Sequence, residues 1–123
     1  MSWRVAVEKL GMEFARANQF LQELDAFPEL NSTSSVARVR WALAQAEERL
    51  KRLYEHWGDS EIEALKRLDE ADKALRFAEK AIDRARELTC FVRRVREERK
   101  RFLHDLGLRL ARAKLERLRA TAP

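Results

Sequence analysis

Apolar residues recur at alternating spacings of three and four along most of the chain, and the clearest run lies between positions 68 and 92. Large residues alternate there with small ones, and polar residues fill the positions between them. Such heptad spacing is typical of a helix that packs against other helices, with alanine on one side so that a neighbour can approach closely. The pattern predicts a long central helix. Its two columns are Leu68, Leu75, Ile82 and Thr89, and Ala71, Ala78, Ala85 and Val92.

Two shorter helices are predicted before this one, each with an unbroken apolar face at the same spacing. The first spans about Trp3 to Asp25 and the second about Val36 to Trp57. The apolar face of the first consists of Trp3, Val7, Leu10, Phe14, Ala17, Leu21 and Leu24. That of the second consists of Val36, Val39, Leu43, Ala46, Leu50, Leu53 and Trp57.

A loop separates these two helices. Pro28 disfavours helical dihedrals at Phe27, and the Ser/Thr run that follows offers Ser34 or Ser35 as the N-cap of the second helix. We expect Phe27 and Leu30 to close one end of the core.

The third helix is predicted to begin after a short turn, in which Gly58 is the C′ residue and Ser60 to Glu63 form a capping box. A turn this short implies antiparallel neighbours. The heptad pattern fails near Arg96 and resumes in a shifted register. At Gly107 the helix either bends, leaving a short fourth helix, or continues. The predicted fold class is an all-α, antiparallel, three-helix, coiled-coil-like bundle with a long basic C-terminal helix extension.

The charge distribution divides the chain into two parts. The whole chain has 26 Lys and Arg against 21 Asp and Glu, a net charge of +5. Residues 1–83 carry a net charge of −3, whereas residues 84–123 carry +8. We therefore expect two domains, an acidic helical body (1–83) and a basic helical extension (84–123) that continues the third helix. Such an extension attracts acidic proteins, nucleic acids or the acidic body of another copy.

Several classes of function find no support in the sequence. No stretch approaches the roughly 20 apolar residues of a membrane-spanning helix, and the N-terminus lacks the apolar core of a secretion signal. Cys90 is the only cysteine, and we expect it to be partly buried, with no disulfide and no cysteine-based metal site. We identify no catalytic set, cofactor motif, metal-binding pattern or small-molecule site. We expect a non-enzymatic cytoplasmic protein that does not bind membranes.

The C-terminal extension carries apolar residues that the two shorter helices cannot reach. An unpaired helix of this kind exposes a large apolar patch, so we expect it to pair with another chain, as a homo-oligomer or with an acidic protein. The alternative is that the chain folds back at Gly107. Aromatic residues outside the heptad columns offer a second contact surface, unless they lean over the edge of the bundle core. The predicted interface residues are Trp41, Phe77, Phe91, Val95, Phe102, Leu103, Leu106 and Leu110.

The arginines of the extension indicate a different partner, nucleic acid. Arginine-rich helices bind phosphate backbones through charge. Four glutamates dilute this charge, and the alternatives are contact with an acidic protein surface or a solvated helix flank. The residues predicted to bind nucleic acid are Arg86, Arg93, Arg94, Lys100, Arg101, Arg109 and Arg112.

Arg99 and His104 fit the pattern Arg-x4-His. This pattern resembles the ribonuclease motif of HEPN domains, which are small all-helical proteins. The resemblance covers six residues, and Lys100 stands where that family often has Asn or Asp. It implies, as a third hypothesis, an RNA-cleaving site at Arg99 and His104. The first hypothesis is a non-enzymatic assembly or adaptor protein that self-associates, or binds a protein partner, through its C-terminal helix.

Overall fold

The computed structural model describes residues 3–56 and 60–121, and every element within them is a helix. No strand occurs in these residues, so the predicted all-α class is confirmed. The predicted turn residues Trp57 and Gly58 lie outside the described residues. The elements in chain order are α1 (Trp3–Asn18), α2 (Phe20–Glu23), the 3₁₀ helices η1 (Leu24–Ala26) and η2 (Pro28–Leu30), α3 (Ser34–Glu55) and α4 (Glu61–Thr121).

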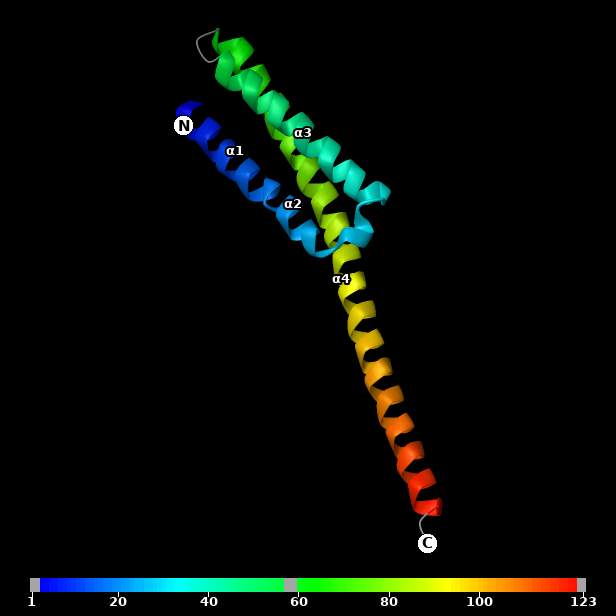
Figure 1. Ribbon diagram of the computed structural model, residues 1–123. Coiled ribbons are helices and arrows are strands. Elements are labelled where there is room, and N and C mark those ends of the chain that lie inside the picture. Colours follow the sequence, from blue (N-terminus) through cyan, green and yellow to red (C-terminus); the bar gives the residue numbers. More distant parts are fainter. Residues whose placement is uncertain (1–2, 57–59, 122–123) are drawn as a thin grey trace. The chain divides into compact units, whose positions relative to one another are not determined.

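The chain forms two compact units, an N-terminal unit (Met1–Leu88) and a C-terminal unit (Thr89–Pro123). Within the N-terminal unit, α3 runs opposite to α1 and to the part of α4 that belongs to this unit (Figure 1). The loop residues Phe27 and Leu30 are buried, as predicted. The central apolar cluster consists of Val7 and Leu10 from α1, Leu50 and Leu53 from α3, and Ala71 and Leu75 from α4.

Alanine gives α4 a narrow face within the N-terminal unit. Four alanines at every seventh position from Ala64 to Ala85 are buried, and none is more than 5% exposed. Because no side chain extends beyond Cβ at these positions, the backbones of neighbouring helices can come close together. The larger Leu75 and Ile82 are also buried. The heptad columns predicted between 71 and 85 therefore lie in the core.

The first predicted helix is interrupted near its C-terminal end. The backbone N–H groups of Gln22 and Glu23 both donate to the Gln19 carbonyl, at 3.0 and 3.4 Å. The shorter i→i+3 bond turns the chain further per residue than regular α-helical bonding does. As a result Phe20, rather than the predicted Leu21, is the fully buried residue, with only 1% of its surface exposed.

Thr33 caps the N-terminus of α3, so the prediction of a cap at Ser34 or Ser35 is wrong. Thr33 has extended dihedrals (φ −79°, ψ 149°), and its Oγ1 accepts a hydrogen bond from the Val36 N–H at 3.4 Å. The same hydroxyl donates to the Leu30 carbonyl at 2.6 Å. This second bond ties the cap to the preceding loop, which neither serine does among the hydrogen bonds of the described residues.

Helix α4 continues through Gly107 to Thr121, so the short fourth helix considered for this region does not form. Gly107 does not have a positive φ, and a Cβ added to it would meet no atom within 4 Å. Strong helix formers on both sides offset its helix-propensity cost of about 1 kcal/mol. At the start of α4, Ser60 Oγ accepts a hydrogen bond from the Glu63 N–H at 3.3 Å, which is one half of the predicted capping box.

Replacing Gly107 with Ala should stabilise α4 locally by about 0.5–1 kcal/mol, because Ala is the better helix former and its methyl group meets nothing. Amide hydrogen exchange followed by NMR should slow around position 107. Gly11→Ala in α1 is the matched control, since a Cβ there would lie 2.7 Å from the Tyr54 hydroxyl oxygen. Tyr54 must move to make room, so the gain around position 11 should be smaller. Unchanged or faster exchange around 107 in Gly107→Ala would contradict a continuous helix at this point.

Candidate protein interface

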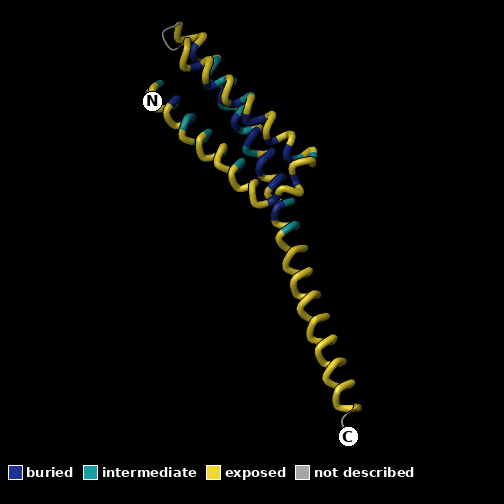
Figure 2. Tube along the Cα trace, viewed as in Figure 1, coloured by how far each residue is buried: buried dark blue, intermediate teal, exposed yellow. Residues whose placement is uncertain are grey.

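The C-terminal unit is a single stretch of α4, and each of its residues from Arg93 to Thr121 is exposed (Figure 2). Apart from Val92, which is partly buried, its large apolar side chains are between 41% and 66% exposed. Six of the predicted interface residues are among them. They are Phe91, Val95, Phe102, Leu103, Leu106 and Leu110.

Five of these residues share one side of the helix, and we call this surface the apolar stripe. At about 100° per residue they fall within an arc of about 100°, with Leu108 and Leu115 on the opposite side. An 11-residue spacing relates Val95 to Leu106 and Arg99 to Leu110, which favours a slightly right-handed path along the helix. The stripe thus has the width of a helix-packing surface. Its members are Val95, Phe102, Leu103, Leu106 and Leu110.

One arginine interrupts the stripe, and a second lies on the same side of the helix beyond the end of the stripe. Arg99 lies between Val95 and Leu103 on the same side of the helix, and Arg117 follows Leu110 by two turns. No ion pair joins either guanidinium to another residue that the structure describes. A helix packed on the stripe would dehydrate both charges, at a cost of several kcal/mol each unless it supplied a carboxylate. The stripe therefore combines an apolar surface with fixed positions for negative charge.

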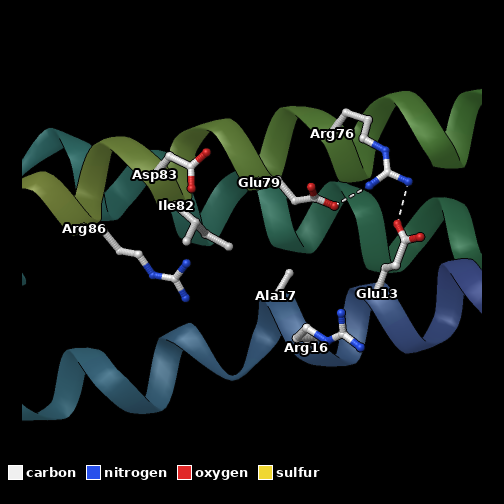
Figure 3. Close-up of a pocket in the computed structure, with 8 residues that line it drawn as sticks. All are labelled: Glu13, Arg16, Ala17, Arg76, Glu79, Ile82, Asp83 and Arg86. Carbon is white, nitrogen blue, oxygen red and sulfur yellow. Dashed lines mark hydrogen bonds and ion pairs between the residues drawn. The ribbon is translucent and has the colours of Figure 1, made fainter.

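The N-terminal unit shows how this chain pairs charges between helices. Arg76 of α4 places Nη2 2.5 Å from Oε2 of Glu13 in α1, and its Nη1 lies 2.6 Å from Glu79 (Figure 3). Arg49 of α3 lies 3.6 Å from Glu70 of α4. In each of these two pairs, an arginine on one helix contacts a glutamate on another helix beside the packed core.

Arg76 is the centre of a group of three carboxylates. Besides Glu13 it contacts Asp72 and Glu79, which lie one helical turn away on either side of it in α4. The pKa of Arg76 is raised, chiefly by its hydrogen bond with Glu13, against partial burial and with further help from the charges of Glu79 and Asp72. The guanidinium therefore remains charged at the edge of an open cleft of about 400 Å³ between α1 and α4.

Arg86 is also engaged within the N-terminal unit. Its guanidinium carbon lies 5.3 Å from the centre of the Phe20 ring, and its Nη2 lies 3.7 Å from the Glu23 carboxylate. An aromatic face attracts a cation through its quadrupole. The sequence grouped Arg86 with the basic extension, but the boundary between the compact units follows Leu88, and Arg86 helps to hold α2 against α4.

The remaining predicted interface residues, Trp41 and Phe77, lie in the N-terminal unit and contact each other. Their ring centroids are 5.9 Å apart and their planes are inclined at 81°, which is an edge-to-face pair. Both side chains are about half exposed. They line an open groove between α3 and α4 together with charged residues of both signs, including Arg49, Glu70 and Lys73. Trp41 and Phe77 form a small aromatic surface, and whether it binds a partner stays a prediction.

The basic residues of the C-terminal unit are spread around the helix. Residues 89–123 contain 11 Lys and Arg against four Asp and Glu, a net charge of +7. Lys100 lies on one side of the stripe, as does Arg93, and Arg109 lies on the other. The other residues predicted to bind nucleic acid form a column about 130–150° from the centre of the stripe. This column contains Arg94, Arg101 and Arg112, and Arg119 extends it.

The residues considered for catalysis or metal binding do not converge. Arg99 and His104 are exposed on one uninterrupted helix, and five positions of about 100° each direct them about 140° apart. Cys90 is exposed, so the expectation that it is partly buried is wrong. It lies between the heptad positions Thr89 and Val92 and belongs to neither column. Among the described residues, no group of three or more His, Cys, Asp or Glu side chains is placed to hold a metal ion.

The chain shows no significant similarity to the known proteins with which it was compared. No protein-family model matches the chain, and neither the curated proteins nor the solved structures include a significant match. Within residues 3–56 and 60–121, no helix combines the length and the apolar content needed to cross a membrane.

A double-mutant cycle with Glu13→Gln and Arg76→Gln should give a coupling of about 1 kcal/mol in the free energy of unfolding, because this pair joins two helices beside the core. The control cycle uses Asp69→Asn and Lys73→Gln, an exposed pair 2.9 Å apart within α4. Its coupling should be clearly smaller, because water screens the two exposed charges. Urea denaturation followed by circular dichroism measures both. Equal couplings would show that the Glu13–Arg76 contact does not hold α1 on α4.

Proposed function

We propose that this protein is a non-enzymatic helical assembly or adaptor protein that binds another helix through the apolar stripe of α4. The stripe carries the proposal, because its five large apolar side chains lie on one side of a continuous helix and each is at least 41% exposed. Monomeric proteins rarely leave a connected apolar patch in water, since full burial of one Leu or Phe side chain contributes about 1.5–3 kcal/mol. The bound helix belongs to a second copy or to another protein.

The same kind of packing accounts for the N-terminal unit. We propose that α1, α3 and α4 form an antiparallel, coiled-coil-like, three-helix bundle, in which side chains of one helix enter the spaces between those of the next. The spacing of buried residues by three and four, and the buried alanines of α4, support this packing. On this proposal α4 is a shared element. Its N-terminal part completes the bundle and its C-terminal part binds the partner.

A nucleic-acid-binding role is the second candidate, and the column of Arg94, Arg101, Arg112 and Arg119 favours it. These residues are exposed on one side of α4, in a unit with a net charge of +7. Guanidinium groups in such a column can contact phosphates of a single strand, with an affinity that falls steeply as salt rises. The column lies away from the apolar stripe, so the two roles use different residues.

Leu106→Asp should weaken helix binding at the stripe at least tenfold, because it places a charge in a surface that must be dehydrated. Sedimentation velocity of the full chain measures this, alone at micromolar concentrations and mixed with synthetic amphipathic peptides that carry a leucine seam. Leu108→Asp is the matched control, since Leu108 is similarly exposed on the opposite side of the helix. It should change binding less than about threefold. A chain that stays monomeric and binds none of the peptides would overturn the proposal.

For the nucleic-acid candidate, Arg94→Gln combined with Arg101→Gln should weaken binding to a single-stranded RNA oligonucleotide. The slope of log K against log salt should fall by about 1.4, because each phosphate contact contributes about 0.7 for single strands. Arg38→Gln combined with Arg40→Gln removes the same charge from exposed positions of α3 and is the control. Filter binding across a salt series measures both slopes. Equal effects would mean that net charge, not the column, binds RNA, and no binding at low salt would exclude this candidate.

A further inference from the structure

We infer that the helix bound by the apolar stripe is an acidic amphipathic helix of a different protein and not a second copy of this chain. The inference rests on the proposed function and narrows it. The stripe alone would accept many apolar helices. The charges within it and beside it restrict which helix fits.

Arg99 within the stripe and Arg117 beyond its end set the first restriction. Arg99 and Arg117 point in nearly the same direction and lie about 27 Å apart along the helix axis. A bound helix must place a carboxylate opposite each of them, or it dehydrates a charge that has no partner. A second copy offers few, because its C-terminal unit has four acidic residues against 11 Lys and Arg and none of the four lies within the stripe. These residues are Glu97, Glu98, Asp105 and Glu116.

The total charge sets the second restriction. The C-terminal unit has a net charge of +7, so pairing two of them would bring together a charge of +14. The N-terminal unit of a second copy does not compensate, since its 15 Lys and Arg nearly balance its 17 Asp and Glu. Its aromatic groove, lined by Trp41 and Phe77, carries Arg49 and Lys73 against a single carboxylate, Glu70. Neither the C-terminal unit as a whole nor this groove of a second copy therefore supplies an excess of negative charge.

The two edges of the stripe set the third restriction. Arg96, Lys100 and Lys114 lie along one edge, whereas Glu98, Asp105 and Glu116 recur along the other at spacings of 7 and 11. A phosphate backbone laid over the stripe would meet both the acidic edge and the apolar centre, so nucleic acid fits this surface poorly. A helix with an apolar seam fits this surface when its glutamates face the basic edge, Arg99 and Arg117.

The N-terminal unit already uses this arrangement. There α4 supplies Arg76 and Arg86 to two ion pairs, and the elements that pack on it supply Glu13 and Glu23. In a further pair the charges are reversed, since α3 supplies Arg49 and α4 supplies Glu70. An acidic helix on the stripe would repeat the division of charge found in the first two pairs. The difference is that the acidic helix on the stripe would belong to another protein.

The test uses the full chain with a fluorophore on Cys90, which is exposed and points away from the stripe. Three synthetic probes of about 30 residues are titrated and followed by fluorescence anisotropy. The first has a leucine seam flanked by Glu, the second has the same seam flanked by Lys, and the third is poly-glutamate without a seam. The Glu-flanked peptide should bind at least tenfold more tightly than either of the others.

Charge-reversal variants locate the effect. Arg99→Glu combined with Arg117→Glu should weaken binding of the Glu-flanked peptide at least tenfold and strengthen binding of the Lys-flanked peptide. Arg94→Glu combined with Arg101→Glu makes the same change of charge on the far side of the helix and should alter either affinity less than about threefold. Circular dichroism confirms that each variant remains helical. Equal losses in the two double variants would overturn the inference, because binding would then depend on net charge alone.

Other outcomes separate the inference from the proposed function. Self-association that Leu106→Asp abolishes, and that the Glu-flanked peptide does not compete with, would make a second copy the occupant. The inference would then fail while the assembly function stood. Equal binding of poly-glutamate and the Glu-flanked peptide would remove the role of the apolar stripe. If no probe binds and the chain stays monomeric, both the inference and the proposed function fail.

Discussion

The buried alanines of α4 leave room for α1 and α3 to pack on it, and the core of the N-terminal unit depends on that room. With no side chain beyond Cβ from Ala64 to Ala85 at every seventh position, Leu and Val residues of the neighbouring helices fill the space around α4. A larger residue in this column would overpack the core and force the helices apart. The polar pairs form at the edges of this close contact. Glu13 of α1 contacts Arg76 of α4, and Arg49 of α3 contacts Glu70 of α4.

The same helix presents a different surface beyond Leu88. Val92 takes the next position of the alanine column, and Arg96 and Arg99 take the positions that follow in the two heptad columns. Large apolar residues resume in a shifted register and are exposed, together with a net charge of +7. Helix α4 thus buries its apolar side within the N-terminal unit and exposes apolar side chains in the C-terminal unit. On the proposed function, its first part belongs to the core and its second part binds the partner.

Arginine has different surroundings in the two units. In the N-terminal unit, Arg76 and Arg86 each face a glutamate on another element, and Arg86 also lies over the ring of Phe20. In the C-terminal unit, Arg99 lies within the apolar stripe and Arg117 lies beyond its end on the same side, and neither forms an ion pair with a described residue. On the proposed function, a bound helix supplies the carboxylates that these two arginines lack.

The sequence by itself determined the helical class, the approximate extent of the helices, the buried columns of α4 and the exposed apolar residues after Arg93. These properties follow from the spacing of apolar residues and from the scarcity of Gly and Pro. Both determine helix formation through neighbours only a few residues away along the chain. Only the tertiary structure decided that Phe20 replaces Leu21 in the core, that Thr33 caps α3 and that Arg76 meets Glu13. The tertiary structure also showed that α4 continues through Gly107 and that Arg86 contacts Phe20 and Glu23 within the N-terminal unit. Each of these depends on a small rotation of a helix or on the position of a neighbour distant in sequence, and a local pattern does not contain either.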